Sequence, residues 1–223
     1  PQLGSATRIP VATSAPPSVS SVIMRFGHDF REGLETVITL PWIWITIVLA
    51  CIADVFEEGL DDVTTPYLVQ RTLHASALLY SGLTAATSVG AILGTLWFGG
   101  RRLRHRGWLI FGYYIIAVLM FMVLGLLPTP PVMLVAMLLF GLFSTVLGLA
   151  WINALQEYVP PERLGRVSSL DELGSYLLNP VSYGVAGVAT DHFGATSVLI
   201  WGGILSAGIF ALGLMSRSVR RLD

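Results

Sequence analysis

Six long apolar segments, separated by short polar stretches, run through most of this 223-residue sequence. A helix rises about 1.5 Å per residue, so roughly 20 residues cross a hydrocarbon core of about 30 Å. Backbone groups in lipid must be paired within the segment, and none of the six alternates polar and apolar residues as a barrel strand does. The sequence predicts an all-α, polytopic membrane bundle of six transmembrane helices, at about 41–70, 77–99, 107–127, 131–158, 167–190 and 195–215.

The composition agrees with a membrane protein and excludes several functions. The chain is 54% hydrophobic and 12% charged, with a mean hydropathy of +0.72, too apolar for an ordinary soluble domain. Its net charge of −1 gives no reason to expect a nucleic-acid partner. The single cysteine, Cys51, allows no intramolecular disulfide and no cysteine-based metal or redox motif. No nucleophile elbow, phosphate-binding glycine loop or metal-ligand spacing is present, so we expect no enzyme, cofactor, metal site or catalytic residue.

Four regions follow from the distribution of polar residues. Residues 1–21 are rich in Pro, Ser and Ala and are expected to be a flexible linker cut from a longer chain. Residues 22–37 mix apolar and charged residues at helical spacing, which fits a cytoplasmic amphipathic helix or, equally, a solvated connector. Residues 38–216 form the six-helix transmembrane domain, and 217–223 are a cytoplasmic tail.

The arginines predict the orientation in the membrane, because positively charged loops stay on the cytoplasmic side. All 13 basic residues are arginine. With the N-terminus inside, Arg71 alone lies outside, and every other arginine is cytoplasmic. We therefore expect a multi-pass protein of the cell (plasma) membrane with both termini in the cytoplasm.

Weak internal similarity at an offset of ninety residues divides the helices into two triplets. Pro41 and the apolar run after it match Pro131 and its run, and 109–112 matches 199–202. An odd number of helices per repeat inverts the second copy. Two inverted three-helix repeats are a recurrent construction of secondary transporters.

Small residues recur at four-residue spacing on two segments. One row is Gly82, Ala86, Gly90 and Gly94, and a shorter row is Gly141, Ser144 and Gly148. Such rows let helix backbones approach closely, so we interpret both as packing surfaces.

Five carboxylates follow the first apolar run, in the stretch DVFEEGLDD. They are spaced i, i+3, i+4, i+7 and i+8, so on a continuous helix they share one face. A helix that began at Pro41 and ended before them would be about 20 Å long, too short for the hydrocarbon core. We therefore expect the helix to continue through the acids; the alternative begins near Leu34 and leaves them in an outer loop. The five are Asp54, Glu57, Glu58, Asp61 and Asp62.

The cost of these acids limits what surrounds them. A carboxylate near the bilayer centre costs about 2.5 to 3.5 kcal/mol, whereas a good apolar residue returns about 0.3 to 0.6 kcal/mol. The stripe must face the bundle interior or a water-filled cavity, where crowded like charges favour proton uptake. It is therefore a candidate proton relay or cation site, with Asp54, the deepest, the first candidate to titrate. Asn153, on the fourth segment, is a further candidate substrate contact.

The stretch NALQEYVPPERLGRVSSL (153–170) resembles the loop after the tenth helix in the drug and macrolide exporter branch of the major facilitator superfamily. Matching positions in this cytoplasmic loop motif are Gln156, Pro160, Gly165 and Arg166. FGHDFREGL (26–34) is similar to the helix that leads into the family's seventh helix, and GVATDHFG (187–194) to the end of the eleventh. The likeness covers about residues 22–215 and corresponds to the C-terminal half of such a transporter. The cytoplasmic loop 99–107 lacks the aspartate of the family's charge-relay motif.

This resemblance implies that the first and fourth helices line a substrate cavity, with the acid stripe and Asn153 in view of it. It also implies a second, N-terminal six-helix half as partner. The stripe and the repeat favour a proton-coupled secondary transporter that works by alternating access on small molecules. The resemblance adds the direction, which is efflux of a lipophilic or cationic compound. The alternative is a non-transporting membrane scaffold or sensor that binds a cation or a partner through the stripe.

Overall fold

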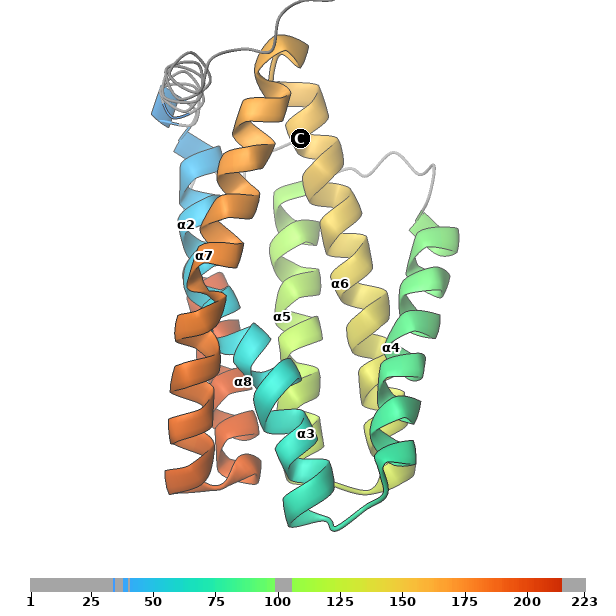
Figure 1. The fold of residues 1–223 in the computed structure, drawn as a ribbon. Coiled ribbons are helices and arrows are strands. Elements are labelled where there is room, and N and C mark those ends of the chain that lie inside the picture. Colours follow the sequence, from blue (N-terminus) through green and yellow to red (C-terminus); the bar gives the residue numbers. More distant parts are fainter. Residues whose placement is uncertain (1–33, 35–37, 40, 99–105, 214–223) are drawn as a thin grey trace, which may run out of the picture.

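The computed structural model describes residue 34 and residues 38–39, 41–98 and 106–213 (Figure 1). The linker 1–21, the tail 217–223 and all of 22–37 except Leu34 lie outside these residues. Each of the six predicted segments corresponds to a long helical segment, and these run side by side up and down the molecule (Figure 1). The first begins with α2 (Pro41–Gly59), and the others are α4 (Ala77–Phe98), α5 (Arg106–Leu126), α6 (Pro130–Tyr158), α7 (Pro161–Phe193) and α8 (Ala195–Gly213).

The first segment continues past the acids without a break. After α2 come a π-helical turn, η1 (Leu60–Thr64), a short α-helical turn, α3 (Thr65–Tyr67), and a second π-helical turn, η2 (Leu68–Thr72). The prediction that the helix passes through all five carboxylates is therefore confirmed, and the interpretation that placed them in a loop is wrong. The hydroxyl groups of Thr64 and Thr65 donate to carbonyl groups five residues back, at distances of 3.2 and 2.8 Å, which fits the wider turn.

Proline and glycine set the ends of the long helices. α6 begins with Pro130 and Pro131, where a missing N–H costs nothing, and α7 begins with Pro161. Gly194, at a φ of 79°, ends α7 in a conformation that side chains rarely adopt. Since α7 begins before the expected Val167, the loop motif lies partly in a helix.

Close backbone contact joins α4 to α6. A Cβ atom added to Gly94 would lie 2.7 Å from the carbonyl oxygen of Leu142, and one added to Gly90 would overlap the backbone of Leu138. From the other side, Gly141 meets the backbone of Thr87. The predicted packing role of the two small-residue rows is thus confirmed for these glycines.

The helix pairs follow a regular pattern. α4 packs on α6 and α7 packs on α2; α5 packs on α6 and α8 packs on α2; and α5 packs on α8. These pairs, the most extensive ones, stay the same when the first triplet of helices is exchanged for the second, whereas the smaller contact of α7 with α8 has no counterpart of similar extent between α4 and α5.

Three of the described helices are long enough and apolar enough to cross a membrane: Ala77–Phe98, Pro130–Tyr158 and Ala195–Leu212. Ile110–Leu126 in α5 is apolar but shorter. α2 and α7 are not among them, and these are the two helices that carry acids within the bundle. Three spans are therefore found by length and composition, against the six expected.

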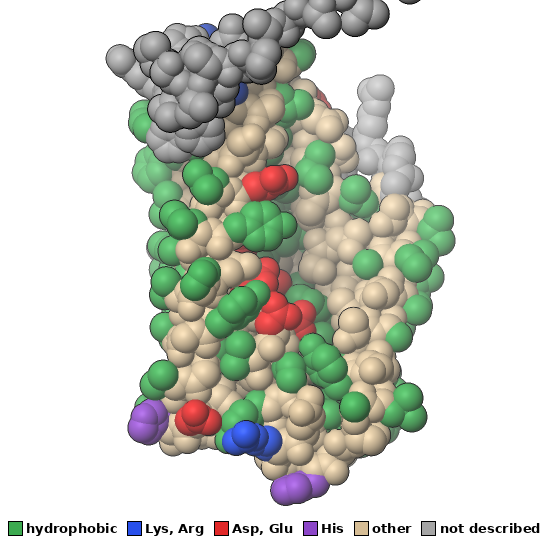
Figure 2. Space-filling model, viewed as in Figure 1, with side chains coloured by type: hydrophobic (Ala, Val, Ile, Leu, Met, Phe, Trp, Pro, Cys, Tyr) green, Lys and Arg blue, Asp and Glu red, His purple; other side chains and the backbone are tan. Residues whose placement is uncertain are grey.

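Two pairs of helices border a hollow on one face of the bundle. α2 and α7 lie on one side of it, α4 and α6 on the other, and α5 lies between and behind them (Figures 1 and 2). Near the start of α2 the hollow is closed by an apolar cluster from α2, α6 and α7, with Ile43, Leu155 and Val167 fully or almost fully buried. The hollow positions the candidate site.

Candidate functional site

Acidic side chains gather in the middle of the hollow, well away from both ends of the bundle (Figure 2). Glu57 lies close enough to Asp54, Glu58 and Asp61 for their charges to interact. These four are half-buried, whereas Asp62 is exposed. The sequence-predicted acids are therefore brought together within the bundle.

Hydroxyl groups of α7 bind two of these acids. The Ser175 hydroxyl donates to Oδ2 of Asp54 at 2.9 Å, and the Tyr183 hydroxyl donates to Oδ2 of Asp62 at 2.8 Å. Both bonds cross from α7 to the first helical segment. They hold the acid stripe against α7 along its length.

A sixth carboxylate, Asp171, joins the site from α7. It accepts a hydrogen bond of 2.7 Å from Nε1 of Trp151 on α6, and its charge acts on Asp54. Asp171, Ser175, Asn179 and Tyr183 are spaced by four residues and so form one polar row along α7. Sequence reasoning missed this row, although its spacing was the signal that could have found it.

Aromatic side chains from α4 and α5 also approach the acids. Tyr80 of α4 is close enough to Asp61 and Asp62 for their charges to act on it. Tyr114 of α5 is buried beside Glu57. Among the described residues, no arginine or histidine acts on Asp54, Glu57, Glu58 or Asp61, and the hydrogen-bond donors to Asp54 and Asp62 are hydroxyl groups.

A glycine lets the acid-bearing helix lie directly against α7. A Cβ atom on Gly59 would lie 2.5 Å from Cβ of Ala186 and 2.9 Å from the carbonyl oxygen of Ser182. Gly59 is followed by the π-helical turn that carries Asp61 and Asp62. Turns of this kind are frequent at functional sites because they change the direction in which side chains point.

The other predicted residues lie at the end of α6 and the beginning of α7. Asn153 is exposed and makes no hydrogen bond within the part of the chain that the structure describes, so its contact with substrate stays a prediction. Of the loop motif, Gln156 is exposed on α6, and Pro160 precedes α7. Gly165 and Arg166, expected in a loop, are helical because the connection between α6 and α7 is so short.

The acids and their neighbours are suited to exchanging protons. A hydroxyl group donates to an ionised carboxylate and accepts from a protonated one, so these pairs stay bonded in both states, which an arginine partner would not allow. Within 34, 38–39, 41–98 and 106–213, no group of three or more His, Cys, Asp or Glu is placed to hold a metal ion.

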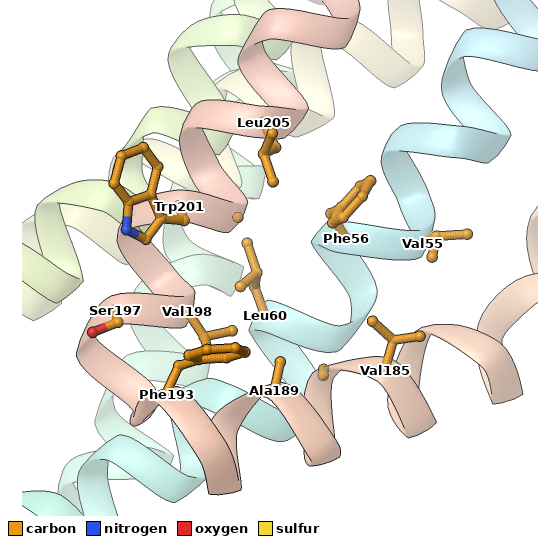
Figure 3. Close-up of a pocket in the computed structure, with 12 residues that line it drawn as sticks. Val55, Phe56, Leu60, Val185, Ala189, Phe193, Ser197, Val198, Trp201 and Leu205 are labelled. Atoms are coloured by element: carbon orange, nitrogen blue, oxygen red, sulfur yellow. The ribbon is translucent and has the colours of Figure 1, made fainter.

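A separate apolar cavity of ≈ 330 Å³ lies between α2, α7 and α8 (Figure 3). Val55, Phe56 and Leu60 line it from the first segment, and Phe193 and Trp201 line it from α7 and α8 (Figure 3). On a helix Phe56 and Leu60 lie on the side away from the acid stripe, whereas Val55 lies at the edge of the stripe, next to the position of Asp62. The cavity contains no titratable side chain and takes no part in the acid chemistry.

Comparison with known proteins gives one family. The family model described as Major Facilitator Superfamily matches residues 7–182, which include the five acids of the stripe, Asp171 and the loop motif. No curated protein and no solved structure matches the chain.

Proposed function

The chain belongs to the Major Facilitator Superfamily, a family of membrane transporters, and from this premise we propose that it takes part in proton-coupled efflux of a lipophilic or cationic small molecule. Membership places the chain in a membrane and confirms that it is a transporter and not an enzyme. It also favours transport over the scaffold or sensor interpretation. The coupling ion, the substrate and the direction are the proposal.

Proton coupling is supported by the partners of the acids. Ser175 and Tyr183 bind Asp54 and Asp62 through hydroxyl groups, and no basic side chain among the described residues acts on the four acids of the stripe other than Asp62. Crowded carboxylates repel one another, and the uptake of a proton relieves that repulsion. This arrangement, a half-buried acid stripe with hydroxyl partners, is the observation that carries the proposal.

A lipophilic or cationic substrate is supported by the aromatic side chains around the acids. Tyr80, Tyr114, Trp151 and Tyr183 come from four different helices and approach the carboxylates. Ring faces attract cations and bury apolar surface, and carboxylates supply the opposite charge. A compound with a cationic and an aromatic part fits this combination. Asn153, on α6, remains a candidate contact for the same substrate.

Alternating access requires a second wall for the hollow. We propose that its open face meets an N-terminal six-helix half, so that this chain supplies the C-terminal half of the transporter. Exchanging the two triplets of helices leaves the most extensive helix pairs the same, which supports two inverted three-helix repeats. On this basis the first and fourth segments, which carry the stripe and Asn153, move against the partner half.

We also propose that the transporter belongs to the drug and macrolide exporter branch and that it lies in the cell membrane. The branch is supported by the loop motif, Gln156, Pro160, Gly165 and Arg166, at the junction of α6 and α7. Arg163 and Arg166 lie at this junction, whereas Arg71 lies in η2, the last turn of the first segment, at the opposite end of the bundle (Figure 1). That distribution supports cytoplasmic termini.

The test is efflux of ethidium, a lipophilic cation, driven by a pH gradient in vesicles that contain the whole transporter. Each acid of the stripe is replaced singly by its amide, and Glu162→Gln, at the exposed start of α7, is the control. We expect loss of pH-driven efflux in at least one stripe variant and full activity in the control. Unchanged flux and pH dependence in all five would refute the proposal, and absence of flux in the unmutated protein would favour a sensor.

A further inference from the structure

Tyr114 has a buried hydroxyl group without a satisfied hydrogen bond. Its side chain is 4% exposed, and no acceptor among the described residues meets hydrogen-bond geometry with its oxygen. Leaving such a group unpaired destabilises the folded protein. A native structure that keeps an unpaired group of this kind calls for an explanation.

The ring of Tyr114 is fixed in place. It stacks on Phe210 of α8, with centroids 3.6 Å apart and an angle of 13° between the planes. The neighbouring Tyr113 instead stacks on Phe143 of α6. Tyr114 therefore cannot turn its hydroxyl group elsewhere at low cost, and the group faces Glu57.

Glu57 has no other donor among the described residues. Its own helical segment contributes three further carboxylates, Asp54, Glu58 and Asp61. α8 has no titratable side chain at all, and those of α6 lie at its last turn. Asp171 of α7 acts on Asp54 and is not among the groups that act on Glu57.

We propose that Glu57 is the carboxyl group that carries the coupled proton, and that Tyr114 is the positioning residue that holds it. This inference rests on the proposed function and replaces the expectation that Asp54 titrates first. Asp54 already has a hydroxyl donor, Ser175, and serves to hold α2 against α7. The Tyr114 hydroxyl, in contrast, lies beside Glu57 and acts on that carboxyl group from the other side of the hollow.

The proton balance of the cycle is simple. When Glu57 is ionised, the Tyr114 hydroxyl donates to its carboxylate. When Glu57 takes a proton from water in the hollow, that bond loses its charge and weakens, since hydrogen bonds to charged groups are the stronger ones. Glu57 later releases the proton to water on the other side of the membrane, and Tyr114 keeps its own proton throughout.

The pair also connects proton binding to helix movement. Tyr114 lies on α5, which packs on α6 and α8, whereas Glu57 lies on α2, which packs on α7 and α8. A hydrogen bond between them joins the two sides of the hollow at its floor. Strengthening and weakening this bond with each proton therefore changes how firmly α2 is held to α5.

The test uses infrared difference spectroscopy of the full chain in lipid vesicles, recorded between alkaline and acidic pH without substrate. Protonated carboxyl groups give C=O bands in this measurement. We expect Glu57→Gln to remove one component that Asp54→Asn leaves in place. In Tyr114→Phe the same component should move in frequency and appear at higher pH, because ionised Glu57 has lost its donor.

Circular dichroism of each variant establishes that it is folded. The assignment of the proton to Glu57 would be overturned if Glu57→Gln left the spectrum unchanged. It would also be overturned if Asp54→Asn removed the same C=O component that Glu57→Gln removes. A Glu57 component unaffected by Tyr114→Phe would overturn the positioning role. Because the measurement needs no flux, it distinguishes failure of this inference from failure of the proposed transport.

Discussion

Gly59→Ala should separate the two helices that form the acid site. The new Cβ atom would lie 2.5 Å from Cβ of Ala186 and 2.9 Å from the carbonyl oxygen of Ser182. Carbon atoms in contact are about 3.5 to 4.0 Å apart, so α2 and α7 must move apart by about 1 Å. Overpacking of this kind costs about 1 to 3 kcal/mol, against about 1 kcal/mol gained by removing a glycine from a helix.

The same movement strains the two hydrogen bonds across this contact. Ser175 to Asp54 is 2.9 Å and Tyr183 to Asp62 is 2.8 Å, and a separation of about 1 Å takes either bond beyond hydrogen-bond distance. Because its acceptor is charged, the part-buried bond from Ser175 to Asp54 contributes about 1.5 to 3 kcal/mol. We therefore expect Gly59→Ala to lower the free energy of unfolding by about 2 kcal/mol or more.

Unfolding in mixed micelles with a rising fraction of SDS, followed by far-ultraviolet circular dichroism, measures this change. The matched control is Gly187→Ala on α7, whose added Cβ atom has no neighbour within 4 Å. It should leave stability unchanged or raise it by up to about 1 kcal/mol. If Gly59→Ala is as stable as Gly187→Ala, the close approach of α2 and α7 is refuted.

Two further predictions concern the same contacts. Ser175→Ala should lower the free energy of unfolding by about 1 to 3 kcal/mol in that assay, because it leaves the part-buried carboxylate of Asp54 without its donor, whereas Tyr183→Phe should cost less because water can replace the exposed bond to Asp62; no loss in Ser175→Ala would show that its bond does not hold α7. Gly90→Ala should weaken the packing of α4 on α6, whereas Gly82→Ala, with its nearest neighbour at 3.5 Å, should be tolerated; equal stability of the two would contradict the observed packing.

The helices of this chain could be predicted because they are determined by the length of the apolar segments and by the proline and glycine residues at their ends. Pro41, Pro161 and Gly194 lie at helix ends, and the need to cross about 30 Å required the first helix to pass through its acids. The regular spacing of Gly90 and Gly94 likewise predicted a close helix contact. In each case the residues themselves carry the constraint.

The rest of the site depends on contacts between distant residues. Asp171 and Ser175 join the acids only because α7 packs on α2, and no pattern in the first segment reveals that. Tyr114 lies within an apolar run, where its hydroxyl group gives no periodic signal. The π-helical turn at 60–64 also escaped prediction, since a single inserted turn leaves the hydrophobic pattern unchanged.

The central claim is that the acid stripe borders water within the membrane. In a Cys51→Ser background, which removes the single cysteine, Glu58→Cys places a thiol on the acid face of α2 and Phe56→Cys places one in the apolar cavity on the opposite face. A membrane-impermeant thiol reagent added to vesicles on either side should modify Glu58→Cys rapidly and Phe56→Cys slowly or not at all. Equal protection of both positions from both sides would contradict the account.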